Sequence, residues 1–91
     1  MIILKDKELE NWIIIKLYRR KLIGKPIDFD DLFSGKKIDK NTILKQLKKM
    51  EKEGIVKSEH SNKSSRRRWA LHPHNLSKWE KIALDNITKG F

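Results

Sequence analysis

The stretch of sequence that decides the fold runs over residues 38–56 and reads I-D-K-N-T-I-L-K-Q-L-K-K-M-E-K-E-G-I-V. Ile43, Leu47 and Met50 recur at the i, i+4 and i+7 spacing that places apolar side chains along one side of a helix. Most of the other positions are polar, and many of them are lysines. The pattern predicts a helix over residues 39–53 that packs on one side and leaves a cationic side open to an anion.

The ends of this helix are marked in the sequence. Asp39 can accept hydrogen bonds from the first backbone amides, and Gly54 can take the left-handed conformation that follows a last helical turn. Beyond the glycine a β-rich pattern begins, which polar residues 60–65 interrupt and residues 66–71 resume. This predicts a β-hairpin over residues 55–71 with a projecting loop.

Alternation along the second arm of the hairpin is expected to separate its side chains. Trp69 and Leu71 fall on one face, whereas Arg66, Arg68 and Ala70 fall on the other. A hairpin with this distribution has an apolar side for the core and a basic side for a partner.

The rest of the chain supplies three more helices. Apolar spacing predicts them over residues 6–23, 28–34 and 75–89, and Asp28 is expected to cap the second of them. No internal repeat or long linker is present. Residues 1–91 are therefore expected to form one mainly α-helical domain with a small β-hairpin.

Composition limits the classes of function. The 91 residues carry 22 Lys and Arg against 12 Asp and Glu, and this net charge of +10 favours polyanions as partners. Nucleic acid is the first candidate and an anionic membrane surface the second. The absence of cysteine excludes a disulfide scaffold and a thiolate site. The apolar runs are shorter than the roughly 20 residues of a membrane-spanning helix, so a cytoplasmic protein without a membrane partner is expected.

Helix, glycine, branched apolar pair and basic hairpin together resemble the winged helix-turn-helix of small prokaryotic transcriptional regulators of the MarR and PadR kind. The likeness covers residues 27–71 and is most direct where residues 50–56 read M-E-K-E-G-I-V. It implies a three-helix core, a wing hairpin and a C-terminal helix. It also implies sequence-specific binding of double-stranded DNA by a nucleoid-associated regulator.

The resemblance places the helix over residues 39–53 in the major groove, where the side chains of its first turns meet base edges. Asn41 can bond adenine, Lys40 or Lys45 can bond guanine, and the methyl group of Thr42 can touch thymine. The DNA-binding residues expected on this helix are Lys40, Asn41, Thr42, Lys45, Lys48 and Lys49.

The same residues could also have purely structural roles. The lysines could form an ordinary solvated helix surface, and Leu44 could either touch a thymine methyl group or pack on Trp69. Lys36 and Lys37 lie in the turn before the helix and are expected to contact the DNA backbone.

The wing is strongly basic, with Glu59 as its nearest acid in the sequence. Arg66 and Arg68 share a face and are expected to reach phosphates or the minor groove. Arg67 shares a side with Trp69 and is expected to pair with an acid or lie over the ring. The alternative is a basic edge that resists strand pairing. The expected wing contacts are Lys63, Ser64, Arg66 and Arg68.

No catalytic, metal or cofactor site is expected. Four acids that could suggest a metal-dependent nuclease stand near helix starts, where capping accounts for them. His72 and His74 have no cysteine or third histidine close in sequence to complete a metal site. No small-molecule effector is expected in so short a chain. The four acids are Asp28, Asp30, Asp31 and Asp39.

The C-terminal helix can pack on the first helix or join two chains. We prefer a homodimer, because a two-fold pair places two reading helices about 34 Å apart, one turn of DNA. Two other functions could use the same surfaces: a winged-helix module for replication, plasmid partition or RNA handling, and a protein-interaction winged helix in a larger complex. The expected dimer residues are Trp12, Leu76, Trp79, Ile82 and Ile87.

Overall fold

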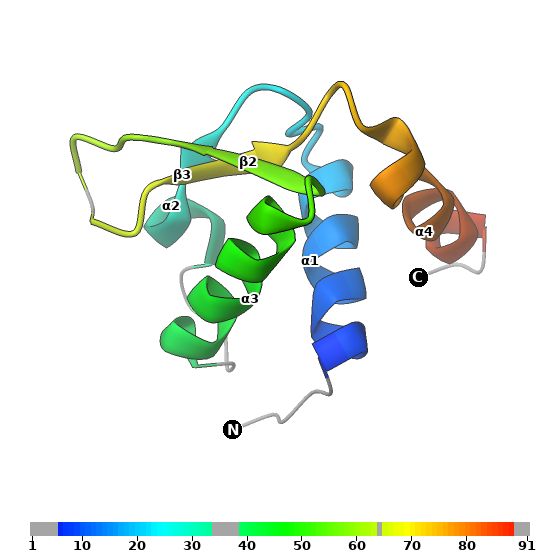
Figure 1. Cartoon of the computed structure of the whole chain (residues 1–91), viewed down its shortest axis with the longest axis horizontal. Helices are drawn as coiled ribbons and strands as arrows, with labels where there is room; N and C mark the ends of the chain where they lie inside the picture. The colour runs from blue at the N-terminus through cyan, green and yellow to red at the C-terminus, as the bar shows by residue number, and fades with distance from the viewer. Residues whose placement is uncertain (1–5, 34–38, 64, 89–91) are drawn as a thin grey trace.

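The computed structural model describes residues 6–33, 39–63 and 65–88 of the chain (Figure 1). Within these ranges the protein is mainly α-helical with one small antiparallel sheet, as the sequence predicts. None of the helices described has the length and apolar content needed to cross a bilayer. In chain order the elements are α1 (Asp6–Arg19), β1 (Ile27–Asp28), α2 (Phe29–Phe33), α3 (Lys40–Lys52), β2 (Val56–Glu59), β3 (Arg68–Leu71) and α4 (Leu76–Thr88).

The caps predicted for α3 are present. The Asp39 carboxylate accepts hydrogen bonds from the Thr42 amide at 3.1 Å and from the Thr42 hydroxyl at 3.3 Å. After the helix, Gly54 adopts a left-handed conformation with φ 81°, and the Ile55 amide donates to the Met50 carbonyl at 2.9 Å. Both ends of α3 are thus fixed by contacts close in sequence.

The first helix is shorter than predicted. α1 ends at Arg19 rather than at residue 23, because Lys21 adopts a left-handed conformation with φ 57°. The chain then runs beside β3, where the Leu71 amide donates to the Leu22 carbonyl at 2.8 Å. Pairing with a strand distant in sequence therefore takes over the residues that helical periodicity assigned to α1.

The sheet has the strand order β1-β3-β2, so β3 is the middle strand. β2 and β3 form the predicted hairpin, in which Val56 lies opposite Leu71. β1 pairs Ile27 with Trp69 on the other side of β3. The sequence pattern did not predict β1, because a strand of two residues has no periodicity to detect.

α2 begins directly after Asp28, the residue predicted to cap it. The Asp28 carboxylate accepts a hydrogen bond from the Ser61 hydroxyl, and the Phe29 amide donates to the Arg67 carbonyl at 3.0 Å. The start of α2 is therefore joined to the base of the hairpin loop. The predicted ends of this helix at residue 34 and of the last helix at residue 89 lie outside the described residues.

The core joins all four described helices to the sheet. α1 lies between α3 and α4 (Figure 1). The apolar stripe of α3, formed by Ile43, Leu47 and Met50, is fully buried, as is Trp69 of β3. Ala70, which alternation places on the basic face, is also fully buried, so both faces of the middle strand are covered at this point.

A polar corner links the end of α3 to the start of α4. The Asn75 side-chain amide donates to the Gly54 carbonyl at 2.9 Å. The His72 amide donates to the Ile55 carbonyl at 3.1 Å, and the Trp79 indole donates to the His72 carbonyl at 3.0 Å. These bonds fix the direction of α4 relative to α3.

Candidate nucleic-acid interface

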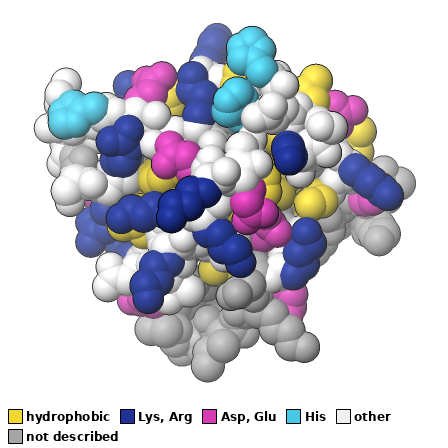
Figure 2. All heavy atoms as spheres, viewed as in Figure 1, with side chains coloured by type: hydrophobic (Ala, Val, Ile, Leu, Met, Phe, Trp, Pro, Cys, Tyr) yellow, Lys and Arg dark blue, Asp and Glu magenta, His cyan; other side chains and the backbone are white. Residues whose placement is uncertain are grey.

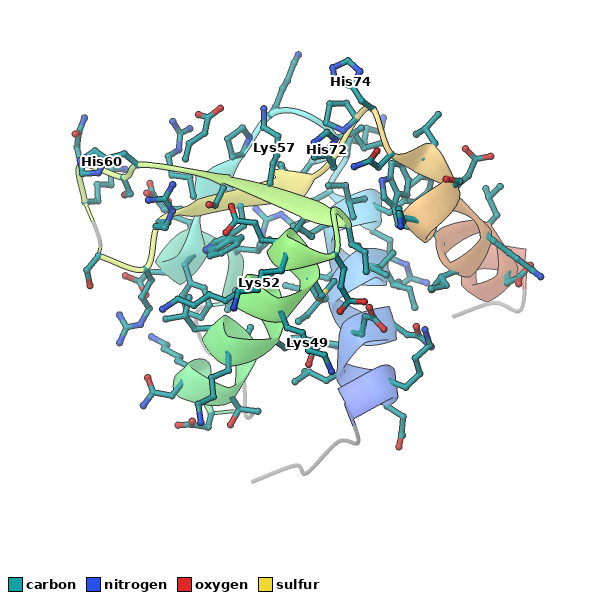
Figure 3. All side chains as sticks on the ribbon, in the orientation of Figure 1. Lys49, Lys52, Lys57, His60, His72 and His74 are labelled. Atoms are coloured by element: carbon teal, nitrogen blue, oxygen red, sulfur yellow. The ribbon has the colours of Figure 1, made fainter. Side chains whose placement is uncertain are left out.

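The outer side of α3 is polar and exposed. Lys49 and Lys52 project from it in Figure 3, and Figure 2 shows Lys and Arg side chains gathered over this face of the molecule, with carboxylates between them. The buried stripe on the opposite side fixes which side chains can reach a ligand. The exposed residues of α3 are Lys40, Asn41, Thr42, Lys45, Lys48, Lys49, Glu51 and Lys52.

Three residues of α3 that are predicted to contact bases differ in the contacts they make within the protein. The Thr42 hydroxyl donates its proton to the Asp39 cap, so its acceptor lone pairs and its methyl group are the parts left for a ligand. Lys40 lies 3.9 Å from the Asp30 carboxylate. Lys45 is exposed, whereas the neighbouring Leu44 is half-buried and packs against the core. Leu44 therefore packs against the core of its own chain, and its contact with a thymine methyl group stays a prediction.

Arg68 does not reach outward as its strand position predicts. Its guanidinium donates from Nη2 to the Pro26 carbonyl at 2.9 Å, and its Nε is buried without a hydrogen-bond partner among the described residues. The side chain is half-buried, and it lies against the segment that leads into β1. The prediction that Arg68 contacts DNA is therefore poorly supported by its geometry.

Arg67, in contrast to Arg68, has an exposed side chain. It has φ 68°, which breaks the strand alternation between Arg66 and Arg68. Its Nε donates to the Ser58 hydroxyl at 2.9 Å, and that hydroxyl donates to Glu51 of α3. Within the part of the chain that is described, Arg67 neither pairs directly with an acid nor lies over Trp69, so both expectations for it are wrong. The sequence carries no signal for this turn, because arginine has no preference for positive φ.

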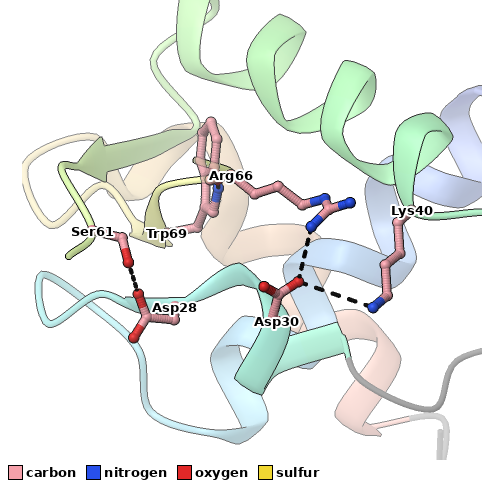
Figure 4. Close-up of polar contacts among 6 residues, drawn as sticks. All are labelled: Asp28, Asp30, Lys40, Ser61, Arg66 and Trp69. Atoms are coloured by element: carbon pink, nitrogen blue, oxygen red, sulfur yellow. Dashed lines mark hydrogen bonds and ion pairs between the residues drawn. The ribbon is translucent and has the colours of Figure 1, made fainter. Parts of the chain in front are cut away.

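Asp30 of α2 lies between the base of the wing and the start of α3 (Figure 4). One of its carboxylate oxygens lies 3.4 Å from Nη1 of Arg66 and 3.9 Å from Nζ of Lys40. The Arg66 guanidinium also lies 5.8 Å from the centroid of the Phe29 ring. The cationic start of α3 and the base of the wing therefore both lie beside Asp30, which the sequence explains only as an acid near a helix start.

The hairpin loop forms a shallow polar hollow. The Ser61 hydroxyl, buried at its base, donates to Asp28 and accepts from the Lys63 amide at 3.1 Å. Lys63 itself is exposed. Ser64, Lys36 and Lys37, also predicted to contact DNA, lie outside the described residues. The hollow is lined by His60, Ser61, Asn62, Lys63, Ser65 and Arg67.

The residues predicted for a dimer differ in how exposed they are. Trp79 is 2% exposed, and its ring lies 5.9 Å from that of Tyr18, so it belongs to the core of its own chain. Trp12 is half-buried beside Phe33. Leu76 is 46% exposed. Ile82 is half-buried, and the structure does not describe the side chain of Ile87.

The histidine pair lies at the polar corner. The His72 and His74 rings are 5.9 Å apart, and Nδ1 of His72 accepts a hydrogen bond from the His74 amide at 3.2 Å. Within the described ranges, no three His, Cys, Asp or Glu side chains are grouped so that they could hold a metal ion. A backbone contact thus accounts for the orientation of His72.

Comparison with known proteins supports the fold. No family model matches the sequence, and no curated protein matches it. Among solved structures, the chain is similar to a cysteine-to-serine mutant of Lactococcus lactis ZitR, with 16% sequence identity and a TM-score of 0.51. The match covers 90% of this chain and 57% of the ZitR chain. The likeness extends over most of the described chain and shows a winged-helix fold.

Proposed function

We propose that this protein binds double-stranded DNA sequence-specifically, as a small transcriptional regulator. The observation that carries the proposal is the division of α3 into a fully buried apolar side and an exposed side rich in lysine. A helix mounted in this way fits the major groove, whose width admits a helix. The winged-helix fold and the net charge of +10 support the same function.

The reading residues follow from the start of α3. Asn41 bonds adenine through its amide, Lys45 donates to guanine, and the Thr42 methyl group contacts thymine. Lys40 reaches either a base or a phosphate group once it leaves Asp30. Lys48 and Lys49 of α3 contact the phosphate backbone, and so do Lys36 and Lys37 of the preceding turn.

The wing supplies further backbone or minor-groove contacts. Lys63, Ser64 and Arg66 keep the role that the sequence predicts for them. Arg67 replaces Arg68 in this role, because Arg67 is exposed whereas Arg68 is bonded to the Pro26 carbonyl. The wing then meets phosphates beside the groove that α3 enters.

The biological setting we infer is that of MarR- and PadR-like prokaryotic regulators acting on the nucleoid in the cytoplasm. The protein occupies its operator as a homodimer and acts by occlusion or recruitment, without catalysis, cofactor or small-molecule effector. A dimer doubles the number of base contacts and gives the operator two-fold symmetry. The chain spans 57% of the length of the ZitR chain. We therefore infer its partners from the surfaces of this chain and not from the ZitR protein as a whole.

The first test is selection of bound fragments from random duplexes, followed by affinity measurements over a range of salt concentrations. A helix and wing that neutralise several phosphates predict that the logarithm of affinity falls linearly with the logarithm of salt concentration, by about 0.9 for each phosphate neutralised. A two-fold symmetric consensus sequence is also expected. A flat salt dependence would contradict the proposal.

Variants of two exposed lysines separate reading from general attraction. Lys45→Ala removes a base contact, so discrimination at one base pair is expected to fall by about 1–3 kcal/mol. Lys81→Ala removes the same charge from α4 and is expected to leave the selected sequence unchanged. Equal selected sequences for the two variants would show that Lys45 does not read a base.

A further inference from the structure

The carboxylate of Asp30 occupies an unusual place for an acid on so basic a protein. It lies between the first residue of α3 and the base of the wing, within 4 Å of both the Lys40 and Arg66 cations (Figure 4). The Asp30, Lys40 and Arg66 side chains are 44%, 45% and 37% exposed. A ligand that approaches this surface can therefore reach all three groups.

The ion pairs at Asp30 are not what holds the wing in place. The Trp69 indole donates to the Arg66 carbonyl at 2.7 Å, and the Phe29 amide donates to the Arg67 carbonyl at 3.0 Å. β1 also pairs with β3 beside the same turn. Because ion pairs this exposed contribute little to stability, loss of the Asp30 charge should leave the wing where it is.

The Arg66 guanidinium keeps its direction by a second contact. It lies 5.8 Å from the centroid of the Phe29 ring, which is fully buried in the core. An arginine over an aromatic ring is attracted to the face of the ring independently of any carboxylate. Arg66 therefore remains directed toward the Asp30 position when the carboxylate is neutralised.

We propose that Asp30 is an internal competitor of DNA phosphate at this surface. The inference rests on the proposed function. Its carboxylate carries the negative charge that a phosphate group would bring between Lys40 and Arg66, and it holds both cations in the free protein. Binding to any duplex then requires exchange of the carboxylate for phosphate, with repulsion between Asp30 and the DNA backbone.

The consequence is lower affinity for every duplex, whatever its sequence. Non-specific binding comes almost entirely from phosphate contacts, and non-operator sites far outnumber an operator in a genome. By weakening those contacts, Asp30 reduces the amount of protein held on non-operator DNA. This effect differs from that of Lys45, which concerns one base pair.

The test compares Asp30→Asn with the matched control Asp31→Asn. Both changes remove one negative charge from the first turn of α2, so their effects on net charge and on the helix start are the same. Asp31 is exposed and has no ion pair within the described ranges. The comparison therefore isolates the release of Lys40 and Arg66.

Dissociation constants are measured for the selected operator and for a random duplex at several salt concentrations. We expect Asp30→Asn to raise affinity for both duplexes roughly three- to tenfold more than Asp31→Asn does, the range expected for loss of two exposed ion pairs. The salt dependence of Asp30→Asn should be steeper by about 0.9 for each additional phosphate that the released cations neutralise. Asp30→Glu, which keeps the charge, should bind like the wild type.

Three results would overturn the inference. Equal affinities for Asp30→Asn and Asp31→Asn would overturn it while leaving DNA binding intact. A lower affinity of Asp30→Asn with an unchanged melting temperature would mean that the carboxylate positions the cations for DNA instead of competing with it. Failure of the wild type to bind duplexes in a salt-dependent way would overturn both this inference and the proposed function.

Discussion

Three consecutive arginines at the base of the wing have three different surroundings. Arg66 pairs with Asp30, Arg67 bonds the Ser58 hydroxyl from an exposed position, and Arg68 bonds the Pro26 carbonyl. The positive φ of Arg67 produces the difference, because it turns the chain between the wing loop and the start of β3. Equal charges at adjacent positions are therefore expected to have different effects on binding and on stability.

Alanine variants of Arg67 and Arg68 should separate these effects. Arg67→Ala removes an exposed cation, so it should weaken binding to all duplexes alike. It should also make the slope of log affinity against log salt concentration shallower by about 0.9. Arg68→Ala removes a half-buried hydrogen bond of a charged group, so it should cost about 1–2 kcal/mol of stability. Binding titrations and thermal unfolding of both variants measure the two effects. The reverse pattern would mean that Arg68 leaves Pro26 to contact DNA.

At this scale the sequence predicts the exposed lysines of α3 but not the arrangement of the wing arginines. The spacing of Ile43 and Leu47 fixes which side of the helix is buried, and this information is local. The conformation of Arg67 instead depends on the hydrogen bond that its carbonyl accepts from the amide of Phe29, a residue distant in the chain. No local pattern records such a contact, nor the contact between Asp30 and Arg66.

At the scale of the elements, the junction between α3 and the wing depends on Gly54. Gly54 has φ 81°, and a Cβ atom there would lie 3.0 Å from Nδ2 of Asn75, which donates to the Gly54 carbonyl. A side chain at this position therefore meets both backbone strain and a close neighbour. The junction between α3 and the wing should be sensitive to substitution here.

Two substitutions of Gly54 test this dependence. Gly54→Ala should lower the free energy of unfolding by about 1–2 kcal/mol, because alanine is disfavoured in the left-handed conformation. Gly54→Asn also adds a Cβ atom but tolerates that conformation better, so it should cost less. Thermal unfolding gives both values. A larger loss for Asn than for Ala would mean that crowding at Asn75, and not backbone strain, dominates.

The elements also show why some boundaries could be predicted and others could not. The limits of α3 follow from Asp39 and Gly54, which act within one turn of the helix ends. The end of α1 and the existence of β1 depend on pairing with β3, a strand far along the chain from either segment. Periodicity within a window cannot contain that information.

At the scale of the whole molecule, α4 has one buried side and one exposed side. Leu76 is 46% exposed and Leu84 is 44% exposed, whereas Trp79 and Ala83 of the same helix are buried against the core. One side of α4 therefore belongs to its own chain. We propose that the exposed Leu76 contributes to a homodimer contact.

Sedimentation equilibrium tests this assembly. We expect the wild type to sediment at twice its mass of 10.9 kDa, and Leu76→Arg to shift the equilibrium toward the monomer, because a charge on an apolar contact is costly to bury. Thermal unfolding of dilute samples serves as the control for folding. A wild-type mass that stays at 10.9 kDa over the full concentration range would remove the dimer from the proposal.

The polar corner between α3 and α4 has a consequence for the spacing of a palindrome. The Asn75 side chain donates to the Gly54 carbonyl, and the Trp79 indole donates to the His72 carbonyl. These bonds hold α3 at a fixed angle to α4, the helix that we propose joins two chains. One inserted base pair rotates the second half of a palindrome by about 35° around the duplex axis, given roughly 10–10.5 base pairs per turn. If two chains bind a palindrome as we propose, the fixed angle between α3 and α4 should therefore make binding sensitive to the distance between the half-sites, and Asn75 helps to set that angle.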